Sequence, residues 1–259
     1  MTRIQTVREL TAEKLKVNIY NTREEMGAQA ARDAAEKIAE LLLQKDRFVN
    51  IIFAAAPSQS EFLNHLSQQN GIDWSRVNAF HMDEYVGISK TAMQSFGWFL
   101  KESFFGKVPL KKVYYINGDA EDPHAECSRY ATLLNEFPAD IVCMGIGENT
   151  HIAFNDPHTA NFNDPELVKV VTLDEVSRQQ QVHDGCFPAI DAVPTSAITL
   201  TVPALLSANT IFCMVPGKNK AAAVYHTIHN VEDEKFPSTS LKKHPGVTLY
   251  LDTDSAAKL

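Results

Sequence analysis

The sequence has few of the features that mark membrane, secreted or nucleic-acid-binding proteins. No apolar run reaches the roughly 18 residues of a membrane span, and the first segment, MTRIQTVREL, contains no apolar stretch typical of a signal peptide. Basic residues number 24 against 32 acidic ones, and the net charge of −8 argues against nonspecific nucleic-acid binding, which depends on neutralising phosphates. We therefore expect a cytoplasmic protein that binds neither a membrane nor nucleic acid.

Motifs for metals and nucleotides are also missing. The four cysteines form no CxxC pair, and HExxH, GxGxxG and GxxxxGK[ST] do not occur. A metal site built from His81, Asp83 and His151 is conceivable, but without a supporting motif we expect no metal. No segment reads as a linker or a repeat, so we expect residues 1–259 to form a single domain.

What the sequence does contain is a regular alternation of helical and strand patterns, with 44% hydrophobic residues. Thr22 and Glu25 form a capping-box pattern at the start of the first helix. Helices are expected at 21–45, 58–69, 95–105, 122–137 and 219–229, and strands at 48–56, 77–83, 111–116, 139–147, 197–202, 209–217 and 246–252. Such alternation predicts an α/β fold with a single doubly wound, mostly parallel, Rossmann-like sheet and helices on both faces.

In doubly wound folds, ligands bind beyond the carboxyl ends of the strands. Three polar segments fall at such ends: AAAPSQS, HMDEYVG and GIGENTHIAFND. In the second, Asp83 or Glu84 is a candidate general base in a partly desolvated pocket. The alternative is an ordinary acidic turn that caps the strand end.

The third segment combines glycines with a histidine. Gly145 and Gly147 allow a ligand to approach the backbone closely. Asn149 and His151 lie two residues apart, which in an extended segment points them the same way, and Asp156 could hold one imidazole nitrogen and fix the tautomer. The alternative is a glycine turn with a structural histidine.

Two further segments are candidates for binding an anion. Ser58 and Ser60 lie where a strand leads into a helix, whose free N–H groups favour anions, although plain helix capping explains Ser58 equally well. Lys218 and Lys220 open another helix, where a cation is unfavourable unless an anion is bound. The alternative is a solvated lysine pair.

Taken together, these segments resemble the glucosamine-6-phosphate deaminase/isomerase family, whose relatives include the 6-phosphogluconolactonases. The likeness runs from about residue 20 to residue 252. FHMDEYVG is similar to the family's FNMDEYVG, and GIGENTHIAFND to its GxGxDGHIAFNE. PGKNKAAAV and SLKKHPGVTLYLD resemble its GxxKA segment and its closing SxLQxH segment.

The resemblance implies isomerisation of a phosphorylated aldose amino sugar to a ketose with loss of ammonia, without cofactor or metal. Asp83 would move a proton from C2 to C1, and His151, oriented by Asp156 and Asn149, would assist ring opening. The residues implied in substrate binding are Ser58, Ser60, Glu84, Gly145, Ile146, Gly147, Arg178, His183 and Lys220. Whether the chain forms a homo-oligomer is left open.

The sequence departs from the family pattern at several of these positions. Asn149 stands where the family has a carboxylate, and Asp156 where it has a glutamate. The phosphate loop PTGGTP is replaced by AAAPSQ, and the family's arginine falls at His183, with Arg178 one helical turn away. These departures keep two alternatives open: a related sugar-phosphate isomerase or lactonase that releases no ammonia, and a non-catalytic sugar-phosphate sensor.

Overall fold

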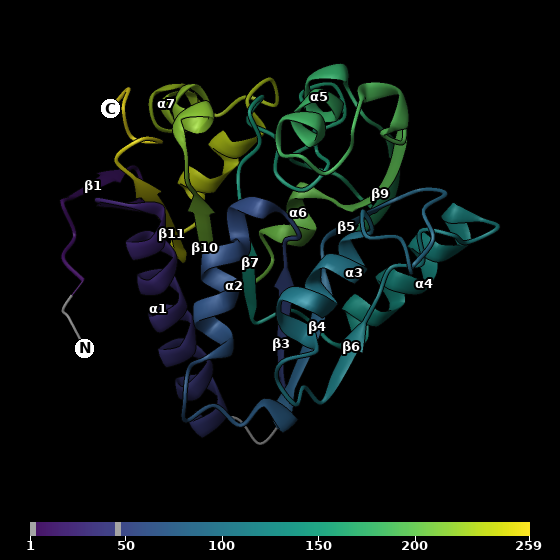
Figure 1. The fold of residues 1–259 in the computed structure, drawn as a ribbon, viewed down its shortest axis with the longest axis horizontal. Coiled ribbons are helices and arrows are strands. Elements are labelled where there is room, and N and C mark those ends of the chain that lie inside the picture. The colour runs from purple at the N-terminus through teal and green to yellow at the C-terminus, as the bar shows by residue number, and fades with distance from the viewer. Residues whose placement is uncertain (1–3, 45–47) are drawn as a thin grey trace.

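The computed structural model describes residues 4–44 and 48–259 (Figure 1). Its main element is an eight-stranded sheet with the order β1-β2-β11-β10-β7-β3-β4-β6, in which only the β1–β2 pair is antiparallel. These strands are β1 (Arg8–Ala12), β2 (Leu15–Tyr20), β3 (Val49–Phe53), β4 (Val77–His81), β6 (Lys112–Tyr114), β7 (Ile141–Met144), β10 (Thr210–Val215) and β11 (Val247–Asp252). The expected doubly wound, mostly parallel sheet is confirmed.

Helices cover both faces of this sheet, as expected. The described helices are α1 (Arg23–Gln44), α2 (Ser60–Ser67), α3 (Phe96–Leu100), α4 (Pro123–Glu136), α5 (Glu175–His183), α6 (Val202–Leu205) and α7 (Ala221–His229). Helices α5 and α6 were not expected, and α5 lies beyond the carboxyl ends of the strands (Figure 1). Neighbouring strand residues point to opposite faces. Ile51 packs with residues of α1, α2 and α3, whereas Ile52 packs with residues of α4, α6 and α7. Helices α1 and α2 lie side by side (Figure 1).

Local signals in the sequence define several element ends. Thr22 accepts a hydrogen bond from the backbone N–H of Glu25, whose carboxylate accepts from the N–H of Asn21, so the capping pattern operates one residue out of register. Asp122 caps α4 in the expected way. Lys45, the last residue of the expected first helix, lies outside the described residues. None of the described helices is both long and apolar enough to cross a bilayer.

A second, three-stranded antiparallel sheet was not expected. It consists of β5 (Asp83–Tyr85), β9 (Ser196–Leu200) and β8 (Val168–Thr172), with β9 between the other two. The prediction that 77–83 is one strand was therefore wrong at its end, because the chain leaves the parallel sheet at Met82. The 197–202 segment is a strand, but it belongs to this second sheet. Pairing between segments more than 100 residues apart is invisible in local patterns.

The strand order reverses between β3 and β7, which are adjacent in the sheet. From β3 the chain proceeds to β4 and β6 on one side, and from β7 it proceeds to β10 and β11 on the other. Loops that follow two strands at such a point leave in opposite directions and open a crevice between them. The segments after β3 and β7 are AAAPSQS and GIGENTHIAFND, so the topology brings two of the three polar segments together.

Candidate active site

A cleft lies at this switch point and holds most of the residues expected in the site. It encloses about 500 Å³ of space, including open solvent at its mouth. The loops after β3 and β7, the start of β5, the start of α3, the second half of α5 and the 3₁₀ helix before α7 contribute to its walls. The polar side chains that line it belong to Ser58, Gln59, Asp83, His151, Gln180, Gln181 and Lys220.

Asp83 is the first residue of β5 and presents a buried carboxylate to the cleft. Its residue is 7% exposed, and its carboxylate has no hydrogen-bond partner among the described residues. Burial, with a smaller contribution from the charge of Glu84, raises the pKa of Asp83 well above its ordinary value of 3.8. A carboxyl group with a raised pKa is suited to accept and return a proton near neutral pH.

The backbone of Asp83 is held by His81, which is completely buried. The N–H of Ile116 donates to Nε2 of His81, so the proton of the ring is on Nδ1, which donates to the carbonyl oxygen of Asp83 at 2.9 Å. Burial lowers the pKa of His81 to about 4. His81 therefore acts as a neutral structural residue beneath the cleft.

His151 lines the opposite wall, and Asn149 fixes its tautomer. The amide nitrogen of Asn149 donates to Asp156 Oδ1 at 3.0 Å and to Asp174 Oδ2 at 2.9 Å. These two carboxylates fix the orientation of the amide, so its oxygen faces His151 Nδ1 at 2.7 Å. An amide oxygen can only accept, which requires the proton on Nδ1 and leaves the lone pair on Nε2.

Asp156 is fully buried behind His151, with its Oδ1 at 3.2 Å from Nδ1. Burial alone would raise the pKa of Asp156, but the hydrogen bond and charge of His151, with hydrogen bonds from Ser177 and Asn149, outweigh it and lower the pKa to about 2. The carboxylate therefore stays ionised and stabilises a positive charge that develops on His151.

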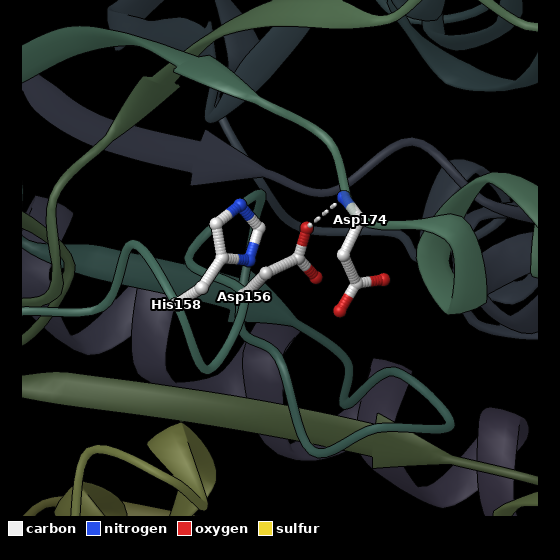
Figure 2. Close-up of side chains that lie close together, drawn as sticks. All are labelled: Asp156, His158 and Asp174. Atoms are coloured by element: carbon white, nitrogen blue, oxygen red, sulfur yellow. Dashed lines mark hydrogen bonds between the residues drawn. The ribbon is translucent and has the colours of Figure 1, made fainter.

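Figure 2 shows Asp156, His158 and Asp174 close together, with the N–H of Asp174 donating to Asp156. Their potential ligand atoms lie within 4.8 Å of one another. All four carboxylate oxygens already accept hydrogen bonds, from Asn149, Ser177 and the backbone of Asp174. The group serves to hold the residues around His151, and we assign it no metal.

Lys220 supplies the positive charge of the cleft. It is 4% exposed at the end of a short 3₁₀ helix, Lys218–Lys220, and neither a hydrogen bond nor an ion pair joins its ammonium to any described residue. Burial lowers the pKa of Lys220, while the charges of Asp184 and Glu148 act in the opposite direction. A buried, unpaired ammonium is costly, so this position favours a bound anion.

Comparison with known proteins identifies the family of this chain. A model described as glucosamine-6-phosphate isomerases/6-phosphogluconolactonase matches residues 21–250. The chain belongs to this family. The resemblance expected from the FHMDEYVG and GIGENTHIAFND motifs is thereby confirmed.

Members of the family that resemble this chain include deaminases and lactonases. A glucosamine-6-phosphate deaminase of Exiguobacterium sp. is 36% identical over 235 residues, which cover 89% of this chain and 90% of the relative. One of Bacillus cereus is 36% identical over 188 residues, 73% and 70% of the two chains. The structure of a monomeric glucosamine-6-phosphate deaminase gives a TM-score of 0.85 at 31% identity over 94% of this chain and 99% of that one. A 6-phosphogluconolactonase of Thermotoga maritima shares the fold at 18% identity and TM-score 0.74, over 92% and 99%.

The structure brings together most of the residues that the sequence singled out. Asp83, His151, Lys220, Ser58 and the backbone of Gly145–Gly147, including Ile146, line one cleft. Asn149 and Asp156 lie behind His151 and contact its ring. Ser58 does not cap a helix; its hydroxyl accepts from the amide of Gln59 at 3.2 Å.

Four expected site residues do not line the cleft. Glu84 turns to the opposite side of β5 from Asp83 and accepts from Ser95 and from the N–H groups that open α3. Arg178 donates to the carbonyl oxygens of residues 190 and 193. His183 is exposed, 3.7 Å from a carboxylate oxygen of Glu148, and Ser60 is exposed at the start of α2. Strand alternation explains Glu84, because neighbours in a strand face opposite ways.

Sequence reasoning missed five polar residues that the structure places in or behind the cleft. Gln59 ends the 3₁₀ helix that follows β3, and the other four belong to α5 or its N-cap: Asp174, Ser177, Gln180 and Gln181. Asp174, Ser177 and Gln181 are spaced by three and four positions, which puts them on one face of a helix. That spacing is visible in the sequence, but nothing local indicates which part of the structure this face of the helix would contact.

Proposed function

We propose that this family member converts a phosphorylated aldose amino sugar, of the glucosamine-6-phosphate type, and water into the corresponding ketose phosphate and ammonia. The observation that carries the proposal is the buried Asp83 carboxylate, which has no hydrogen-bond partner among the described residues and lies in the same cleft as His151 and Lys220. A base, an acid/base for ring opening and a cation for a phosphate are the three groups that this chemistry needs.

The reaction begins with the phosphate bound at Lys220. Nε2 of His151 accepts the proton of the anomeric hydroxyl and returns it to the ring oxygen, which opens the ring. Asp83 then takes the proton from C2, next to the carbonyl carbon, while a proton of the substrate ammonium is transferred to the carbonyl oxygen, which gives an enolamine. Asp83 delivers its proton to C1, and the C1 carbon with its hydroxyl is then next to an imine at C2. The resulting imine at C2 adds water and releases ammonia, so that one water is consumed for each ammonia formed.

The relatives that support this proposal carry the name glucosamine-6-phosphate deaminase. Asn149 is the feature of this chain that most weakens the analogy, because an amide supplies no charge to the histidine. Asp174 offsets this missing charge in part. Its Oδ2 accepts a hydrogen bond from the amide nitrogen of Asn149 at 2.9 Å, which places a second carboxylate next to Asp156. The carboxylates of Asp156 and Asp174 are therefore both hydrogen-bonded to Asn149, which contacts His151.

Turnover of glucosamine 6-phosphate by the wild-type protein and an Asp83→Asn variant tests the proposal, with ammonia and ketose measured in parallel. We expect ammonia from the wild type and a loss of at least about 100-fold in kcat in the variant, because a positioned base contributes on the order of 10²–10⁴. Asp119→Asn, at an exposed aspartate, is the matched control and should keep wild-type activity.

Other results would favour the alternatives. Ketose or hydrolysed lactone without ammonia would identify a related isomerase or lactonase. Ligand-induced thermal stabilisation without turnover in either protein would identify a sensor, the reading that Asn149 favours. Either result would overturn the proposed deamination.

A further inference from the structure

Ser177 is buried in the first turn of α5. Its side chain contacts His151 and Asp156 on the side of the imidazole ring away from the cleft. It is 1% exposed, and its hydroxyl oxygen lies 2.8 Å from His151 Nδ1. The same hydroxyl donates a short hydrogen bond to Asp156 Oδ1. Its backbone N–H is bound by the capping carboxylate of Asp174 at 2.7 Å. One serine thus joins the helix to both members of the histidine–carboxylate pair.

Counting protons fixes the direction of these hydrogen bonds. Asn149 already requires a proton on Nδ1 of His151. A hydroxyl placed between this N–H and an ionised carboxylate has only one proton, which it donates to the carboxylate, and its lone pair faces the N–H. The single Nδ1–H of His151 is therefore shared between Oδ1 of Asn149 and Oγ of Ser177, and a chain of bonds runs from it through Ser177 to Oδ1 of Asp156.

A hydroxyl that donates to a carboxylate becomes a stronger acceptor, because hydrogen bonds in a chain polarise one another. Ser177 thereby transmits part of the negative charge of Asp156 to the imidazole. This matters here because Asp156 itself is 3.2 Å from Nδ1, farther than the oxygen atoms of Ser177 and Asn149. Asn149, whose amide also donates to Asp156, is one such polarised route from the carboxylate to the ring, and Ser177 is a second.

We propose that Ser177 is a positioning residue for His151, which holds the imidazole through Nδ1–H and stabilises the positive charge that the ring gains when Nε2 accepts a proton. The inference rests on the proposed function for its kinetic consequence, but not for the contacts themselves. It assigns to α5 a part in the chemistry in addition to the cleft lining that Gln180 and Gln181 provide.

Kinetics of Ser177→Ala with glucosamine 6-phosphate test this role. We expect kcat to fall about 10-fold or more, because the lost hydrogen bond is to a group that becomes charged, and KM to stay within about twofold of wild type, because Ser177 does not line the cleft. Ser177→Cys, which keeps a weak donor, should recover part of the loss. Ser240→Ala removes an equally buried hydroxyl, bonded to the carbonyl oxygen of Pro237, and should leave kcat unchanged.

A spectroscopic measurement separates positioning from a general structural effect. The Nδ1–H proton of His151 should resonate far downfield in the wild type and move upfield in Ser177→Ala, but not in Ser240→Ala. An unchanged resonance, or a kcat of Ser177→Ala equal to that of the control, would overturn the proposal. If the wild type releases no ammonia at all, the proposed function fails, and the resonance alone decides the role of Ser177.

Discussion

The backbone of Gly147 lies directly against the imidazole ring of His151. The N–H of Gly147 donates to the carbonyl oxygen of His151 at 2.9 Å, and a Cβ at position 147 would lie 2.2 Å from both Cε1 and Nε2 of the ring. Two non-bonded heavy atoms cannot approach so closely. Glycine is therefore required at this position by the histidine and not by the turn itself.

We expect Gly147→Ala to displace the imidazole and to lower kcat about 100-fold, because a shift of about 1 Å in a catalytic group has an effect of that size. At Gly145 a Cβ would lie 3.0 Å from the end of the Gln59 side chain and 3.2 Å from the carbonyl oxygen of Met214, contacts that a shift of a few tenths of an ångström relieves, so Gly145→Ala should have a smaller effect. Parallel measurements of kcat and thermal unfolding check this order. Equal losses in the two variants would contradict it.

Lys220 should affect the affinity for the phosphorylated substrate more than it affects kcat. We expect Lys220→Met to raise KM for glucosamine 6-phosphate about 10–100-fold, because the variant loses a charged hydrogen bond to the phosphate. The change in kcat should be smaller. The same variant should be at least as stable as the wild type, because methionine replaces a buried ammonium that no described residue pairs with.

Lys218→Met is the control for this prediction, since Lys218 is exposed in the same short helix and does not line the cleft. Its KM should stay within about twofold of wild type. A Lys220→Met variant with an unchanged KM would show that the anionic group of the substrate binds elsewhere. Denaturant titration of both variants measures the stability part.

His81 should make the folded state sensitive to acid. Its pKa is lowered to about 4 in the folded protein against 6.5 for an ordinary histidine, so between these values the unfolded chain binds more protons. The contribution of His81 to the free energy of unfolding is complete above about pH 6.5 and is lost as the pH falls towards 4. Because a tenfold difference in proton affinity equals about 1.4 kcal/mol, the loss should reach about 3 kcal/mol.

Urea titrations of the wild type and His81→Gln at a series of pH values between 4 and 7 test this. The difference in the free energy of unfolding between the two proteins should shrink as the pH is lowered through this range. Carboxylates such as Asp83 titrate in both proteins and cancel in the difference. A difference that stays constant with pH would mean that His81 is not held neutral.

The sequence by itself determined the layers of the fold and the motifs of the site. Strands such as β3 are buried along their whole length, as their continuous apolar runs indicate, and the capping residues Asp122 and Thr22 act where they were expected. The HMDEYVG and GIGENTHIAFND segments carry the catalytic candidates because residues at strand ends converge in any doubly wound sheet. These features depend on local periodicity and on neighbours in the chain.

Only the tertiary structure decided which side chains share the cleft. It separated Asp83 from Glu84 by pairing residues 83–85 with β9, an antiparallel partner more than 100 positions away. It turned Arg178 towards backbone carbonyl groups. On the same helix, it brought Ser177 into contact with His151 and Gln181 into the wall of the cleft. The physical reason is that the orientation of a helix or short strand is set by what it packs against, and that partner is distant in the sequence.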